Sequence, residues 1–251
     1  MLKRLTSYFL VVAMALSLIF IFGCPNPDDD NGTVPKPSNL TIVADALGDG
    51  VILSWDEVSD VDGYDVITPD GDTLLLNYDD LTYTDDTPAS TGTYSVYAVD
   101  GDNRSDPATV SDAPYVSSSN VTLYGWNETE PSGFGWTSAT GVGETYSVAD
   151  STYEAVVDFY FYDLSGFFDF VSGDESPYEG TKHTGIANLQ DSNFDIAPES
   201  GYYTLQSITP LYYYAFFVEA HYYAKVYVVS TTSTSVTFSY EFQTIANLRI
   251  F

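Results

Sequence analysis

The chain has 251 residues, of which 44% are hydrophobic, so it can bury a sizeable core and does not have the composition of a disordered protein. Its 36 Asp and Glu face only 7 Lys and Arg, which gives a formal net charge of −29. This charge would repel a phosphate backbone, so the composition argues against nucleic-acid binding and against basic patches for anionic lipid. The single Cys excludes a disulfide framework and a multi-cysteine metal site.

The first residues have the organisation of an export signal. Lys3 and Arg4 precede an uncharged run over 8–22, which has the length of a signal h-region and is short for a membrane span. The run ends in Ile21-Phe22-Gly23-Cys24, which resembles the lipobox of bacterial lipoproteins. The resemblance implies a signal peptide over 1–23, acylation (palmitate, for example) of Cys24, and an extracytoplasmic protein anchored by this lipid to the bacterial cell membrane or outer membrane. An uncleaved signal anchor is the alternative.

The next segment is polar and rich in proline. Residues 25–38 read PNPDDDNGTVPKPS and carry almost no apolar side chain. Such a segment stays extended and hydrated, so we expect a tether over residues 24–36.

Short alternating segments separated by Gly, Asp and Pro follow the tether. They predict seven strands, at 40–43, 51–55, 64–67, 73–76, 81–84, 94–99 and 108–111. Asp-Gly pairs at 62–63, 70–71 and 100–101 supply residues that tolerate the positive φ of tight turns. This spacing is typical of an antiparallel sandwich.

The order of motifs in this region resembles a fibronectin type III domain, assigned to residues 37–113. The matching motifs are Pro37-x-x-Leu40, Val51-x-Leu53-x-Trp55, Val61-x-Gly63-Tyr64-x-Val66, Thr82-Tyr83-x-Asp85 and Gly92-Thr93-Tyr94-x-Val96-x-Ala98-Val99. The resemblance implies an immunoglobulin-like sandwich in which Trp55 fills the core and the Tyr94 hydroxyl bonds to the backbone. The Arg-Gly-Asp tripeptide through which some members bind integrins is absent.

Residues 115–251 are too many for a second module of that kind. Alternation predicts strands at 154–163, 212–219, 224–228 and 236–243, whereas 165–210 is rich in Gly and Pro and is expected to be mostly loop. The overall fold class is therefore all-β: the fibronectin-like sandwich followed by a second antiparallel sandwich or jelly roll of about eight strands. The region resembles C-terminal modules of other bacterial surface lipoproteins in the order of its motifs, which are Phe134-Gly135-Trp136, Asp158-Phe159-Tyr160-Phe161, Ala197-Pro198-x-x-Gly201-Tyr202 and Tyr223-Ala224-Lys225-Val226. This resemblance does not identify an activity.

Aromatic side chains are the main functional clue in residues 115–251. Sugar rings dock on flat aromatic faces, and consecutive tyrosines must place some rings on the outer face of a sheet. The candidate ligand platform consists of Trp126, Trp136, Tyr212, Tyr213, Tyr214, Tyr222 and Tyr223. Cross-strand packing of the same rings is the alternative interpretation.

Turns rich in Asp make calcium a candidate cofactor. Asp60 and Asp62 in one turn, and Asp100 and Asp102 in another, place carboxylates within reach of one cation. Neither segment is a twelve-residue calcium loop, and hairpin chemistry explains the same residues, so no metal site is assigned and no other cofactor is expected.

Catalytic motifs have little support. Glu219 and His221 would share one face of a strand, and His183 is expected on the surface, but neither has an identifiable third partner. We therefore expect a non-catalytic, lipid-anchored envelope protein whose β-sandwich binds a glycan or an envelope protein, in adhesion or in a structural role. The alternative is a glycan-active hydrolase with catalytic carboxylates in the C-terminal domain.

Overall fold

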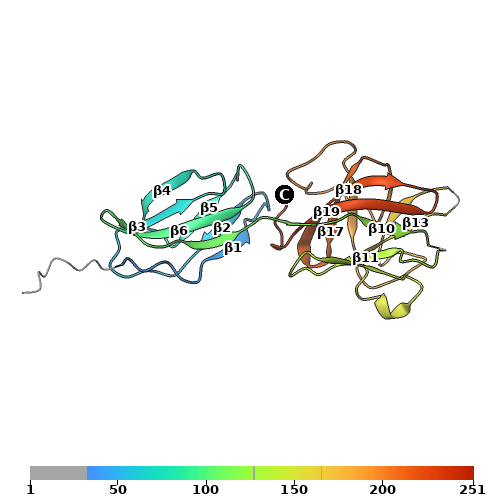
Figure 1. Ribbon diagram of the computed structural model, residues 1–251, viewed down its shortest axis with the longest axis horizontal. Coiled ribbons are helices and arrows are strands. Elements are labelled where there is room, and N and C mark those ends of the chain that lie inside the picture. Colours follow the sequence, from blue (N-terminus) through green and yellow to red (C-terminus); the bar gives the residue numbers. More distant parts are fainter. Residues whose placement is uncertain (1–32, 127, 165) are drawn as a thin grey trace, which may run out of the picture. The chain divides into compact units, whose positions relative to one another are not determined.

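The computed structural model describes residues 33–126, 128–164 and 166–251, and the predictions for residues 1–32, including Cys24 and most of the tether, lie outside these ranges. The described chain is an antiparallel all-β protein, and residues Val34–Phe251 form one compact unit (Figure 1). Its helical elements are two short 3-10 turns, at Ser151–Tyr153 and Glu219–His221. None of the helices in these ranges is both long and apolar enough to cross a bilayer.

The first sandwich has the fibronectin type III, immunoglobulin-like arrangement. One sheet has the order β1-β2-β5, made by β1 (Thr41–Ala44), β2 (Val51–Ser54) and β5 (Thr82–Asp85). The facing sheet has β4 (Thr73–Tyr78), β3 (Gly63–Ile67) and β6 (Thr93–Asp100) in that order, and β7 (Asn103–Arg104) and β8 (Ala108–Ser111) both pair with β6. The strands coincide closely with those predicted from the alternation.

The core of this sandwich confirms one ring assignment and corrects another. Trp55 is 5% exposed and packs edge-on against Tyr64, with ring centroids 5.4 Å apart. The Tyr94 hydroxyl donates to Asp85 Oδ2 at 2.9 Å, so the predicted backbone partner is wrong. Burial, together with this carboxylate, raises the pKa of Tyr94 well above its ordinary value and keeps the phenol a donor. It is the Tyr64 hydroxyl that bonds to the backbone, accepting from the N–H of Val58.

The second sandwich is built from two larger sheets. The first has the order β10-β19-β18-β17-β15, formed by β10 (Val121–Tyr124), β19 (Ser235–Gln243), β18 (Tyr222–Thr231), β17 (Tyr213–Val218) and β15 (Gly185–Asn188), with β9 (Tyr115–Val116) also paired to β19. The second has the order β12-β11-β13-β14-β16, formed by β12 (Gly143–Tyr146), β11 (Gly133–Trp136), β13 (Phe159–Tyr162), β14 (Asp169–Ser172) and β16 (Leu205–Ser207). A bridge between Ile186 and Tyr203 links the two sheets at one edge.

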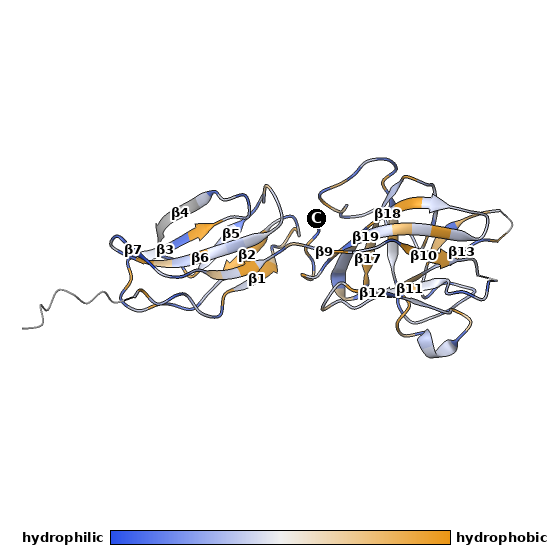
Figure 2. Ribbon diagram, in the orientation of Figure 1, coloured by the Kyte–Doolittle hydropathy of each residue, from blue (hydrophilic) through white to orange (hydrophobic). Residues whose placement is uncertain are grey.

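Interlocked aromatic rings fill the space between these two sheets. Phe159 lies at the centre, with its ring centroid 4.7 Å from that of Phe216 and 5.3 Å from that of Trp136. Alternation along β18 and β19 turns the apolar side chains of both strands inward, and Figure 2 shows their hydrophobic residues in orange. Offset and edge-on ring contacts of this kind add to the free energy gained by burying apolar area.

Three expectations for this region are wrong. Residues 165–210 are mostly loop, as expected, but this stretch also contains β14, β15 and β16, so the described part of 115–251 has eleven strands instead of about eight. The predicted strand at 154–163 begins only at Phe159, after a 3-10 turn. Glu219 and His221 lie in the second 3-10 turn, where His221 has φ 65°, so they do not share a strand face. The strands β13 to β16 are short and bounded by turns, so each contains too few residues to show a clear alternation of apolar and polar side chains.

Candidate functional site

The predicted aromatic platform does not form one surface. Trp136 is 5% exposed and Tyr214 is fully buried, and both belong to the ring-filled core. The Tyr214 hydroxyl also donates to the carbonyl of Ser207 at 2.9 Å. The prediction is therefore wrong for these two rings, because the pleat turns their side chains inward.

Three other candidate rings are used in packing. Trp126 lies against Tyr160, with ring centroids 5.4 Å apart, in a small cluster with Tyr162 and Tyr178. Tyr222 stacks on Phe242 at 5.8 Å, and Tyr212 packs against the same main core. These contacts correspond to the packing alternative rather than to a shared platform.

Tyr213 is the platform candidate that lies in an accessible ring pair. It is directly opposite Tyr227 in the β17–β18 register, and the two ring centroids are 4.7 Å apart at an interplanar angle of 38°. Both rings are half-buried, on the outer face of the sheet. Ser239 pairs with Tyr227 on the next strand, and Leu211, just before β17, is 60% exposed. The sheet thus presents an aromatic surface beside a hydroxyl group.

Sequence reasoning missed Tyr227. The signal was present, because the strand pattern places Lys225 and Tyr227 on the face opposite the small apolar residues of β18. The register with β17, which puts Tyr227 against Tyr213, could not be read from the pattern alone.

Tyr223 lies on the same outer face of the sheet, but neighbouring side chains cover its ring. Its ring is 5.2 Å from that of Phe217 and 6.5 Å from that of Tyr202, which belongs to the loop before β16. Burial raises the pKa of Tyr223 above its ordinary value. Lys225, on the same face, is also buried. Its Nζ lies 3.6 Å from Glu241 Oε1 and faces the ring of Phe194. This part of the outer face is a second small core.

The candidate calcium residues are used in turns. Asp62 Oδ2 accepts the N–H of Gly101 at 2.8 Å, which fastens the turn before β3 to the β6–β7 hairpin. Asp60 supplies a positive φ of 60° in the same turn, and Asp100 and Asp102 flank Gly101. Within the described ranges, no group of three or more His, Cys, Asp or Glu is arranged to hold a metal ion.

A polar cluster in the second sandwich joins Asp158, just before β13, to the loop between β14 and β15. Asp158 is fully buried; its Oδ1 lies 3.0 Å from Lys182 Nζ and its Oδ2 accepts the N–H of Trp136 at 2.6 Å. Burial raises the pKa of Asp158 even though these partners oppose the shift.

Asp174, in the same cluster, bonds to the Ser172 hydroxyl and lies 2.8 Å from His183 Nδ1. Partial burial raises the pKa of Asp174, but these hydrogen bonds outweigh it and hold the pKa below its ordinary value. His183 is exposed, as predicted. The carboxylate, rather than the imidazole, is the middle member of this chain, which is not the order of a Ser-His-Asp triad.

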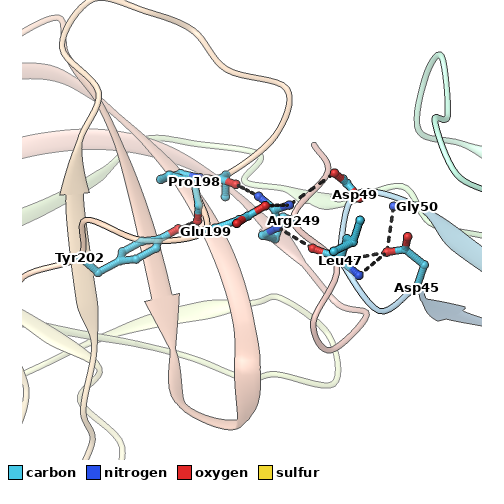
Figure 3. Close-up of polar contacts among 10 residues, drawn as sticks. Asp45, Leu47, Asp49, Gly50, Pro198, Glu199, Tyr202 and Arg249 are labelled. Atoms are coloured by element: carbon cyan, nitrogen blue, oxygen red, sulfur yellow. Dashed lines mark hydrogen bonds and ion pairs between the residues drawn. The ribbon is translucent and has the colours of Figure 1, made fainter.

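A cleft of about 520 Å³ lies where the C-terminal residues meet the loop between β5 and β6. Ile196, Ile250 and Phe251 form its apolar part, and Asp49, Asp86 and Asp195 are the acids that line it. Beside the cleft, Arg249 contacts residues of both sandwiches, as Figure 3 shows.

Comparison with solved structures finds chains that are similar to this one at low identity. An Fn3-like protein from Clostridium thermocellum is 22% identical, with 32% of this chain and 91% of that chain covered and a TM-score of 0.29. A DUF4466 family protein from Parabacteroides merdae is 11% identical, covering 82% and 96%, with a TM-score of 0.41. A two-domain fibronectin type III segment from chicken tenascin is 14% identical, covering 82% and 97%, with a TM-score of 0.26. No protein-family model and no curated protein sequence matches the chain.

Proposed function

We propose that this protein is a lipid-anchored, non-catalytic protein of the bacterial cell envelope whose second sandwich binds a glycan. The anchor rests on the lipobox-like sequence around Cys24, and the polar tether would hold the sandwiches away from the bilayer. Two or more acyl chains anchor a protein stably in a bilayer. Electrostatic attraction could not replace them, because an anionic membrane surface repels a protein with a net charge of −29.

The observation that carries the binding proposal is the Tyr213–Tyr227 pair. Two tyrosine rings on an outer sheet face, 4.7 Å apart and inclined at 38° to one another, offer apolar ring surface to the C–H groups of a sugar ring. Ser239, opposite Tyr227, brings a hydroxyl that can donate to or accept from the sugar hydroxyls.

Two carboxylates of the second sandwich, Asp158 and Asp174, are used in contacts within the fold. Both oxygens of Asp158 are engaged, by Lys182 and by the backbone of Trp136, and Asp174 bonds to Ser172 and His183. Glycoside hydrolysis requires one carboxyl group to protonate the leaving group and another to act on the sugar or on a water. Asp158 and Asp174 are therefore poor candidates for this pair, which supports the proposal of binding without turnover.

A glycan array tests the binding proposal. The double variant Tyr213→Ala/Tyr227→Ala should lose binding to the glycans recognised by the native protein, because both stacking faces are removed. Tyr203→Ala is the matched control, since Tyr203 is 62% exposed and lies elsewhere on the surface. Binding that survives the double variant, or that is lost equally in the control, would contradict the assignment. Release of shortened glycan would instead support the hydrolase.

The anchor is tested separately by Cys24→Ser. Metabolic labelling with palmitate should label the native protein and not the variant, and the variant should leave the membrane fraction. Membrane retention of an unlabelled variant would point to an uncleaved signal anchor.

A further inference from the structure

The last residues of the chain lie in the core of the first sandwich. Leu248 is fully buried and Ile250 is 5% exposed, and both pack in the cluster that contains Val51, Leu53 and Trp55. They follow β19, a central strand of the second sandwich. The first core is therefore completed by side chains from the far end of the sequence.

Arg249, between these two apolar residues, bonds to backbone groups of both sandwiches. Its N–H donates to the Gly48 carbonyl at 2.7 Å and its Nε to the Leu47 carbonyl at 3.1 Å, in the turn between β1 and β2. Its Nη1 donates to the Ala197 carbonyl at 2.6 Å, in the loop before β16. Ion pairs to Asp49 at 3.6 Å and Glu199 at 3.5 Å flank it (Figure 3). A buried guanidinium with this many acceptors is held in one orientation.

A second bridge lies at the end of β19. The Gln243 side chain is fully buried, and its Nε2 donates to the Asp112 carbonyl at 2.9 Å and to the Ile250 carbonyl at 3.0 Å. Asp112 directly follows β8 of the first sandwich. One amide group thus ties the first sandwich, the second sandwich and the C-terminal segment together.

The β1–β2 turn is shaped to receive the segment. Asp45 Oδ1 accepts the N–H groups of Leu47, Gly48 and Gly50, which leaves the carbonyls of Leu47 and Gly48 directed at Arg249. Gly48 has φ 76°, and a Cβ there would lie 2.4 Å from the Asn247 carbonyl oxygen. Only glycine allows this turn and this close approach together.

We propose that residues 244–251 are an intramolecular docking segment that completes the first sandwich, so that this sandwich depends on the segment for stability and opens together with the second. A fibronectin-like module would otherwise be expected to fold on its own. Here its open end is an interaction surface for an apolar-basic-apolar sequence, Leu248-Arg249-Ile250, supplied by the same chain.

Hydrogen exchange measured by mass spectrometry on the full chain tests this proposal. Leu248→Ser should accelerate exchange of the β2 and β6 amides, in the first sandwich, by at least about tenfold, because loss of the docked side chain favours opening of that core. Leu205→Ser is the matched control, since Leu205 is 48% exposed on β16 and should leave these rates unchanged. Native rates in β2 and β6 of Leu248→Ser would overturn the proposal.

A milder variant keeps the test decisive if Leu248→Ser does not fold. Arg249→Lys preserves the charge but loses the paired contacts to Leu47 and Ala197, so it should accelerate the same β2 and β6 amides by a smaller factor, of roughly threefold or more. Acceleration confined to the second sandwich would overturn the proposal.

Discussion

The two sandwiches fill their interiors in different ways. The first is centred on aliphatic side chains of facing strands, with three rings and two residues from the C-terminal segment. The second is filled by rings that contact one another across both sheets. The small aliphatic side chains of the first sandwich leave one end of its core to be filled by the C-terminal segment. In the second sandwich, ten or so interlocked rings fill the whole core with residues of that sandwich alone. The fibronectin-like sandwich therefore depends on the C-terminal segment, whereas the ring-filled sandwich closes its own core.

Removing the central ring of the second sandwich should have the largest effect. Phe159 is fully buried and contacts Trp136, Phe170 and Phe216. Phe159→Ala should lower the free energy of unfolding by about 3–5 kcal/mol, since the rings around it cannot all collapse into the cavity. Denaturant unfolding followed by circular dichroism measures this change. Phe167→Ala, at a site 69% exposed, is the control and should change little.

Removing the indole of the first sandwich gives the corresponding test of the dependent partner. Trp55→Ala should cost about 3–5 kcal/mol, because the ring lies at the centre of that core against Tyr64. If the docking segment couples the two sandwiches, unfolding should stay a single transition at a lower denaturant concentration. A loss of well under about 1 kcal/mol would contradict the core placement of Trp55.

The same comparison explains how far the sequence could predict the structure. Strands of the first sandwich alternate clearly between Asp-Gly turns, so their positions and the burial of Trp55 followed from the pattern. In the second sandwich, β14 to β16 are three or four residues long, too short to show a period. Leu248 and Ile250 alternate as a strand would, but their partners lie some two hundred residues earlier, and no local pattern carries that information.

The candidate site was predictable in kind but not in membership. An abundance of tyrosine indicates that some rings must face outward. In a run such as Tyr212-Tyr213-Tyr214, however, the sequence alone does not show whether the middle ring or its two neighbours face outward. Pairing with β18 decides between them: Tyr214 is opposite Val226 and turns inward, whereas Tyr213 is opposite Tyr227 and turns outward. Register depends on strands far apart in the chain, so the ring pair is visible only in three dimensions.

The joint between the sandwiches should respond to pH through Asp112. Asp112 is 1% exposed; one carboxylate oxygen accepts the Gly92 N–H at 2.6 Å and the other has no hydrogen-bond partner in the structure. Burial raises the pKa of Asp112 to about 6, with Asp85 adding repulsion. The folded state therefore binds more protons than the unfolded state between about pH 4 and 6, and the contribution of this group falls as pH rises through that window, by up to about 3 kcal/mol.

Asp112→Asn measures that contribution directly. The neutral amide should raise the free energy of unfolding relative to the native protein at pH 7.5 and change it much less at pH 4, where the native carboxyl is already protonated. Denaturant unfolding at a series of pH values gives the difference between the two proteins, in which the other carboxylates cancel. Asp106→Asn, at an exposed site, is the control. A difference that does not grow between pH 4 and 7.5 would show that Asp112 ionises normally.

The smallest expected effect separates the turn role of Asp62 from a calcium role. Asp62 accepts the Gly101 N–H at 2.8 Å, so Asp62→Ala should cost about 1 kcal/mol or less at this exposed turn. Asp102→Ala removes an equal charge from the same pair of turns. Among the residues that the structure describes, no backbone N–H donates to the Asp102 carboxylate, so this variant should cost less still. The loss of stability in each variant should be the same with calcium and with a chelator, because a hydrogen bond that holds a turn needs no cation. A calcium site would give a different result: the ion would stabilise the native protein and leave the stability of both variants unchanged.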